Sequence, residues 1–101
     1  MRLLDLGTLT AVAAGTSFAT AGLGFLPSES VKAEIFSPDN AFAGSAQIQT
    51  SPDGTTWSNV GVAKANAGYD TFTITLSNYV RLNATARTAG SVKAVLVNDI
   101  G

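Results

Sequence analysis

The sequence contains no cysteine and no histidine among its 101 residues. Without cysteine, the chain has no disulfide framework and no thiolate that could act as nucleophile or metal ligand. Without histidine, it lacks the most common general base and the most common ligand of transition metals. Catalytic sites of the Ser-His-Asp and Cys-His types are therefore excluded.

Charge is also scarce. Charged residues make up 13% of the chain, and six basic and seven acidic side chains leave a net charge of −1. The charges are scattered singly, so no basic patch can neutralise phosphates and we expect no binding to nucleic acid. No apolar run approaches the roughly 18 residues of a membrane-spanning helix, so we expect no contact with a membrane. Asp5 interrupts the apolar start of the chain, which argues against a signal peptide.

The carboxylates give little support for catalysis or metal binding. Most of them lie at predicted turns or strand ends, where an aspartate typically bonds to its own backbone. No dense Asp-x-Asp-x-Asp-Gly loop is present for calcium, and no glycine pattern carries a phosphate-binding Lys-Ser/Thr signature. We therefore expect no catalytic residue, no cofactor and no metal site, and hence a protein that is not an enzyme.

Alternating apolar and polar residues dominate the chain, a pattern typical of half-buried β-strands. In segment 70–77, for example, Phe72, Ile74 and Leu76 alternate with threonines. Strands are also expected, separated by turn residues, in segments 2–12, 16–22, 30–37, 44–51, 56–65, 79–87 and 91–98. This spacing predicts one all-β domain over residues 1–101, an antiparallel β-sandwich of jelly-roll or Ig-like type with about seven or eight short strands.

The inward positions of these strands define the predicted core. Residues 1–24 are rich in glycine, alanine and threonine, so they are expected to form either an edge strand or an N-terminal arm. The core residues are expected to be Leu4, Leu6, Val31, Ile35, Ile48, Trp57, Val60, Val62, Phe72, Ile74, Leu76, Val80, Leu82, Val95 and Leu96.

The segment 51–57, Ser-Pro-Asp-Gly-Thr-Thr-Trp, predicts a hairpin turn. Pro52 presets φ for the second turn position, Asp53 suits the third, and Gly54 suits the permissive position after it. Two roles are open for Trp57, which follows the turn. Its indole either covers one end of the sandwich or forms a sugar-binding platform together with Tyr69 and Tyr79.

The 51–57 hairpin and the later Tyr-Val-Arg strand at 79–81 are similar to those of discoidin-type β-sandwich modules, many of which bind sugars, lipids or matrix proteins. The same pair of motifs resembles small virion structural proteins of tailed bacteriophages. The second resemblance extends to the chain length, the Ala/Thr/Gly/Ser-rich composition and the lack of cysteine. The ligand-binding loops of discoidin-type modules have no counterpart here, so the phage-type resemblance is favoured.

This resemblance implies a virion protein, which we expect to be a capsid decoration (cement) protein on the capsid surface. It would bind the major capsid protein, stabilise the assembled shell and self-associate, with a trimer as one option. A tail, neck or fibre component is one alternative, and a carbohydrate- or cell-surface-binding module is another.

The expected shell-facing contact is the segment 1–14. The apolar loop 22–30 either covers the core or, if its large apolar side chains are exposed together, adds to this contact. Because a terminal arm can fold against a partner at low cost, deletion of residues 1–14 is expected to abolish particle binding and leave the sandwich folded. The residues expected to bind the partner are Met1, Arg2, Leu3, Leu4, Leu23, Phe25 and Leu26.

Overall fold

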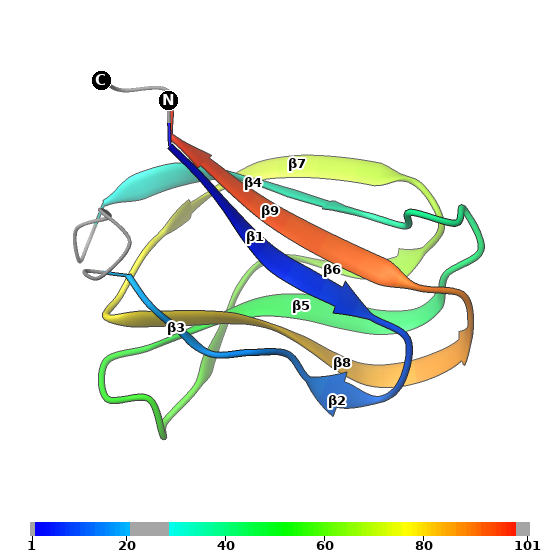
Figure 1. The fold of residues 1–101 in the computed structure, drawn as a ribbon, viewed down its shortest axis with the longest axis horizontal. Helices are drawn as coiled ribbons and strands as arrows, with labels where there is room; N and C mark the ends of the chain where they lie inside the picture. The colour runs from blue at the N-terminus through cyan, green and yellow to red at the C-terminus, as the bar shows by residue number, and fades with distance from the viewer. Residues whose placement is uncertain (1, 21–28, 99–101) are drawn as a thin grey trace.

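The computed structural model describes residues 2–20 and 29–98, and these residues form β-strands and no helix (Figure 1). The predicted all-β class is confirmed. The strands are β1 (Arg2–Leu9), β2 (Ala13–Ala14), β3 (Phe18–Ala19), β4 (Ser30–Phe36), β5 (Ala43–Ser51), β6 (Ser58–Asn66), β7 (Tyr69–Thr75), β8 (Tyr79–Ala89) and β9 (Val92–Asn98).

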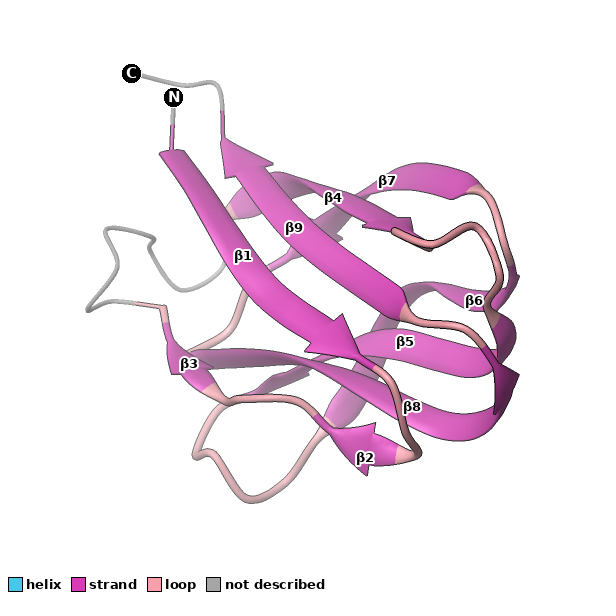
Figure 2. Ribbon diagram, turned by 45° about the vertical axis from the view of Figure 1, so that its right-hand side comes forward, coloured by secondary structure: helices cyan, strands magenta, loops and turns pink. Residues whose placement is uncertain are grey.

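The strands form two antiparallel sheets that pack face to face (Figure 2). Sheet A has the order β1-β9-β4-β7, and sheet B has the order β2-β8-β5-β6, with β3 also paired to β8. Apart from the β5–β6 hairpin and the step from β2 to β3, consecutive strands lie in opposite sheets. Strands that alternate between two sheets in this order make a jelly roll. The order therefore decides between the two predicted sandwich types.

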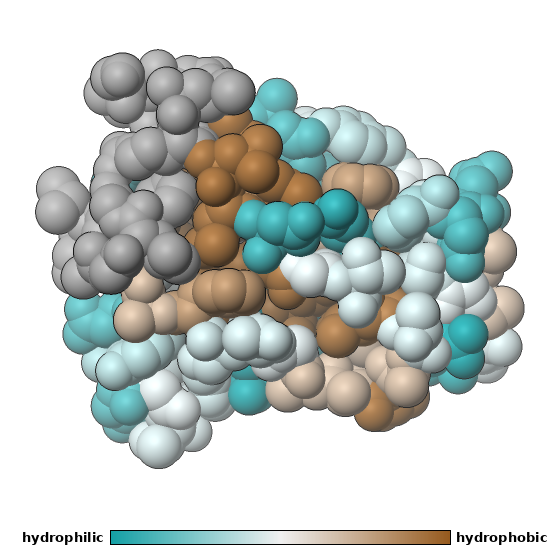
Figure 3. All heavy atoms as spheres, viewed as in Figure 1, coloured by the Kyte–Doolittle hydropathy of each residue, from teal (hydrophilic) through white to brown (hydrophobic). Residues whose placement is uncertain are grey.

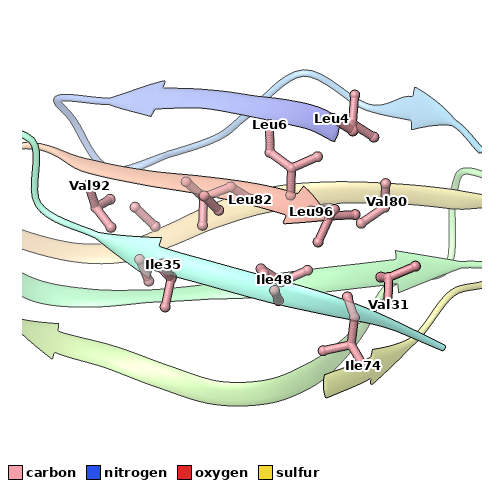
Figure 4. Close-up of a cluster of buried hydrophobic side chains, with 14 of the residues drawn as sticks. Leu4, Leu6, Val31, Ile35, Ile48, Ile74, Val80, Leu82, Val92 and Leu96 are labelled. Atoms are coloured by element: carbon pink, nitrogen blue, oxygen red, sulfur yellow. The ribbon is translucent and has the colours of Figure 1, made fainter. Parts of the chain in front are cut away.

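The core lies between the sheets and is built from the inward residue of each alternating pair (Figure 4). Burial of these apolar side chains stabilises the fold by roughly 25 cal/mol per Å² removed from water. Val60 and Phe72 are half-buried and pack against the core. The buried apolar residues are Leu4, Leu6, Val31, Ala33, Ile35, Phe42, Ala46, Ile48, Ile74, Leu76, Val80, Leu82, Ala84, Val92, Ala94 and Leu96.

Three residues expected in the core are not part of it. Val95 lies between buried Ala94 and buried Leu96, so strict alternation turns its side chain to the outer face of sheet A. Trp57 is half-buried on the outside of sheet B. Val62 is 58% exposed, although its position in the alternation of β6 predicted an inward side chain.

A bulge in β6 explains the exposure of Val62. Ile48 of β5 pairs with Val60, but Ala46 pairs with Lys64, so three residues of β6 oppose one residue of β5. Gly61 begins the bulge with φ of 75°, a conformation that glycine adopts at little steric cost. The extra residues interrupt the alternation, and Val62 is carried out to solvent.

The N-terminal segment is an integral part of both sheets. β1 is the edge strand of sheet A and contributes Leu4 and Leu6 to the core. The chain then crosses to sheet B, where the N–H of Gly15 donates to the carbonyl of Leu82 at 2.7 Å. Thr20 is buried, and its Oγ1 donates to the carbonyl of Ser77 at 2.7 Å. Of the two predicted forms, residues 2–9 thus adopt the edge strand.

Candidate functional site

The hairpin predicted around Pro52 is confirmed as the connection between β5 and β6. Ser51 is buried, and its Oγ accepts the N–H of Gly54 at 2.8 Å. Asp53 Oδ1 accepts the N–H groups of Thr56 and Thr55, both at 2.9 Å. These donors, first Thr56 and then Thr55, hold the pKa of Asp53 well below its ordinary value. Any stability that this carboxylate contributes is present above that ordinary value and is lost as the pH falls below it.

The turn is also fixed to the start of β8. Asn78 Nδ2 donates to the carbonyl of Pro52 at 2.9 Å. The ring of Tyr79 lies beside Gly54, where an added Cβ would be 3.5 Å from the ring. Gly54 has φ of 82°, as expected for the permissive turn position. Tyr79 therefore supports the turn that precedes Trp57.

Trp57 joins a row of polar side chains on the outer face of sheet B. The guanidinium carbon of Arg81 lies 4.1 Å from the centroid of the Trp57 ring. Arg81 Nε donates to Gln49 Oε1 at 2.8 Å, and Gln49 Nε2 donates to Asn59 Oδ1 at 2.9 Å. We call Trp57, Arg81, Gln49 and Asn59 the indole row. One face of the indole is covered by the cation, an arrangement that contributes roughly 0.5–1 kcal/mol at an exposed site.

The structure does not bring Tyr69 to the other two candidate platform residues. Tyr69 begins β7 in sheet A, whereas Trp57 and Tyr79 lie at the opposite end of β6, beside sheet B. The length of β6 separates the two places by about 30 Å. Tyr69 instead packs on Phe36, with ring centroids 5.6 Å apart. Its hydroxyl donates to the Glu34 carboxylate, which raises the pKa of Tyr69.

Of the predicted partner-binding residues, the structure exposes Leu3 and buries Leu4. Leu3 is 60% exposed on the outer face of sheet A, whereas Leu4 points into the core. The prediction of Leu4 as a core residue is therefore confirmed, and its prediction as a surface contact is wrong. The two orientations follow from alternation along β1. Arg2 is the first residue of β1. Met1, Leu23, Phe25 and Leu26 lie outside the described residues.

Leu3 belongs to an apolar patch that sequence reasoning missed. Its neighbour across the pairing of β1 with β9 is Val97, and the next outward residue of β9 is Val95. Both valines are half-buried. We call Leu3, Val95 and Val97 the β1–β9 patch. Figure 3 shows hydrophobic atoms gathered over this part of the molecule, next to a hydrophilic band. An ion pair of 3.1 Å between Asp5 and Lys93 borders the patch.

Comparisons with known proteins give no family for this chain. No protein-family model matches the sequence, and a search of curated proteins found no match. In residues 2–20 and 29–98, no pocket is present and no three acidic, histidine or cysteine side chains could hold a metal ion together. None of the described elements is a helix that could cross a membrane. The two outer surfaces described above, the indole row and the β1–β9 patch, are the candidate sites of this chain.

Both surfaces could be found only after strand pairing was known. Sequence alternation already placed Gln49 and Arg81 on outward positions of their strands. It could not show that Asn59, Gln49 and Arg81 are neighbours across three strands, which follows from the registers of β5 with β6 and β8. The same applies to Leu3 and Val97, which are far apart in sequence.

The stacking in the indole row predicts a spectroscopic effect. Replacing Arg81 with alanine should move the emission of Trp57, the single tryptophan, to longer wavelength because water reaches the uncovered indole face. The free energy of unfolding should fall by about 1 kcal/mol. Arg87→Ala is the control, since Arg87 is exposed and donates to the Gly90 carbonyl instead. Unchanged emission in the Arg81 variant would contradict the stacked arrangement.

Proposed function

We propose that the protein is a non-enzymatic structural component of a bacteriophage virion, specifically a decoration protein that binds and stabilises the assembled capsid. The similarity of the 51–57 hairpin and the 79–81 strand to small phage virion proteins supports this proposal. The jelly-roll strand order is compatible with it, because viral capsid proteins use this architecture. Lectins use this architecture as well, so the fold is equally compatible with capsid decoration and with carbohydrate binding.

The observation that carries the proposal is the β1–β9 patch. Antiparallel sheets usually present polar residues on their solvent-facing side. Here, Leu3, Val95 and Val97 are instead adjacent on the outer face of sheet A, and Leu3 is 60% exposed. The ion pair of Asp5 and Lys93 lies at the border of the patch. An apolar centre with a polar rim is typical of a protein-binding surface. We therefore assign the shell contact to this patch.

A charge placed on the patch tests this assignment. Leu3→Glu should weaken binding to particles that lack the protein by roughly 30-fold or more, as expected when a central contact of an interface is lost. Val62→Glu is a matched control, because Val62 is 58% exposed but lies in β6 of sheet B. Binding would be measured by co-sedimentation with the particles, after thermal melts have shown that both variants are folded. Equal binding by both variants would contradict the assignment.

Copy number separates decoration from the other virion positions. Particles purified on a density gradient would be analysed by mass spectrometry for the ratio of this chain to the most abundant shell protein. A ratio near that of the shell protein supports decoration. A copy number that is only a small fraction of that of the shell protein indicates a position in the tail, neck or fibres. Absence from the particles contradicts a virion role altogether.

The indole row supports one second candidate, a carbohydrate-binding module. Trp57 lies in line with amide and guanidinium groups that could bond to sugar hydroxyls. However, Arg81 already covers one face of the indole, and Tyr69 lies elsewhere. Under the decoration proposal, addition of oligosaccharides leaves Trp57 emission unchanged. A saturable shift that is lost in Arg81→Ala would favour the carbohydrate-binding function.

A further inference from the structure

The edges of the two sheets differ in how they are protected. An edge strand presents unpaired backbone N–H and C=O groups, to which another strand can add unless a bulge, a charge or a short length prevents it. Among the described strands, the edges of sheet A are β1 and β7, and those of sheet B are β6 and the β2/β3 side. Three of these four edges are interrupted by a register shift or are very short.

β1 has a register shift between Asp5 and Thr8, where Gly7 has φ of 94° and donates its N–H to Asp5 Oδ1 at 2.7 Å. On the β2/β3 side, each strand is only two residues long. β6 contains the bulge at Gly61, and its Lys64 is an inward-pointing charge, 3% exposed, bonded to Asp70 at 3.0 Å. Each of these features discourages strand addition.

β7 has neither a bulge nor a short length, and its one inward-facing charge, Asp70, is already bonded to Lys64 of the same chain. It pairs with β4 over seven consecutive positions, from Thr75 with Ser30 to Tyr69 with Phe36, without a register shift. Its sequence, Tyr-Asp-Thr-Phe-Thr-Ile-Thr, has no glycine, proline or lysine, and its single charge, Asp70, is bonded to Lys64. The strand runs along the margin of sheet A in Figures 1 and 2, and Thr71, Thr73 and Thr75 are exposed.

We propose that β7 is a self-association site, at which two copies of the chain pair β7 with β7 in antiparallel orientation about a two-fold axis. When the two-fold axis passes through Thr73, the two copies of β7 bring compatible side chains opposite each other. Thr73 then faces its own copy and Thr71 faces Thr75, pairs that contribute roughly 0.2–1 kcal/mol each. On the inward side, Phe72 faces Ile74 and its half-exposed ring gains cover. Asp70 faces the apolar Leu76, so no like charges meet. A two-fold interface requires this self-complementarity.

The pairing would join the two four-stranded A sheets into one continuous sheet. A two-fold axis that relates antiparallel neighbours within a sheet is perpendicular to that sheet, so both outer faces point the same way. Both β1–β9 patches then lie on one side of the dimer. If the proposed function is correct, this dimer binds the shell through two contacts, which raises its effective affinity by linking them. The pairing itself does not depend on that function.

The oligomeric state of the purified full chain tests the pairing. Analytical ultracentrifugation over a range of concentrations should show a mass of two chains for the wild type. Thr73→Lys places two lysines opposite each other at the axis and should weaken the dimer at least tenfold. Thr85→Lys, an equivalent change at an exposed position of β8, should have no effect. A monomer at all concentrations, a trimer, or a dimer unaffected by Thr73→Lys would overturn the proposal.

A cross-link gives a second readout that does not require dissociation. Because the chain has no cysteine, Thr73→Cys introduces a single thiol. Directly opposed residues of an antiparallel pair have Cα atoms about 4.5–5.5 Å apart, within the range that a disulfide spans. Mild oxidation should therefore convert Thr73→Cys to a covalent dimer, and Thr85→Cys should remain monomeric on a denaturing gel. Equal cross-linking of both variants would contradict the pairing. Neither readout involves particles, so a failure here is distinct from a failure of the decoration function.

Discussion

Deletion of residues 1–14 is expected to unfold the protein, and not merely to remove a contact with its partner. The deletion removes β1 and β2, and with them the core residues Leu4 and Leu6. Loss of one buried leucine side chain typically costs about 2–5 kcal/mol, whereas a domain of this kind is stable by only about 5–15 kcal/mol. The expectation from sequence, a detachable arm on an intact sandwich, is thus inconsistent with the position of β1.

Circular dichroism and urea unfolding of a fragment comprising residues 15–101 would test this prediction. The fragment should show no cooperative transition. A matched pair of substitutions refines the test, because Leu6 is 1% exposed and Leu3 is 60% exposed on the same strand. Leu6→Ala should lower the free energy of unfolding by about 2–5 kcal/mol. Leu3→Ala should change it by less than about 0.5 kcal/mol. A cooperative transition in the fragment would show that β1 is dispensable for the fold.

Replacing Gly61 with alanine is expected to destabilise the protein strongly. Gly61 has φ of 75°, a region that costs a residue with a Cβ about 1–2 kcal/mol. The added Cβ would also overlap the ring of Phe72, which packs against the core. Overpacking of this kind costs about 1–3 kcal/mol. The two effects together should lower the free energy of unfolding by about 2–5 kcal/mol.

Gly7→Ala separates the two effects. Gly7 has φ of 94°, but an added Cβ there would have no atom within 4 Å. This variant should show only the conformational cost, about 1–2 kcal/mol, and the difference between the two variants measures the clash with Phe72. In a double-mutant cycle, Phe72→Ala should relieve part of the damage caused by Gly61→Ala. Equal losses at Gly61 and Gly7 would contradict the close packing of the bulge on Phe72.

Alternation alone identified the inward faces of β4, β7 and β8. In β4, Val31, Ala33 and Ile35 are buried and face away from Lys32 and Glu34. This could be predicted because the two-residue period is a local property of an extended chain. The turn at Pro52 and Gly54 was predictable for the same reason, since its geometry depends on residues that are neighbours in sequence.

The bulge in β6 was not predictable, and it explains the error at Val62. Whether three residues of β6 oppose one residue of β5 depends on how the two strands pair and on the position of Phe72 beneath Gly61. A lone glycine in a strand suggests a bulge but does not specify its length. Trp57 was misplaced for a similar reason, because its contact with Arg81 crosses the intervening strand β5.

Sequence alone therefore specified an all-β sandwich, most of its core and the hairpin at residues 51–57, and it excluded catalysis that depends on histidine or cysteine. These properties follow from composition and from contacts between residues close along the chain. The tertiary structure decided the jelly-roll order, the exposure of Val62, the separation of Tyr69 from Trp57, and the location of the β1–β9 patch and the uninterrupted β7 edge. These depend on strand pairing and register, which join residues far apart in sequence and which no local pattern determines.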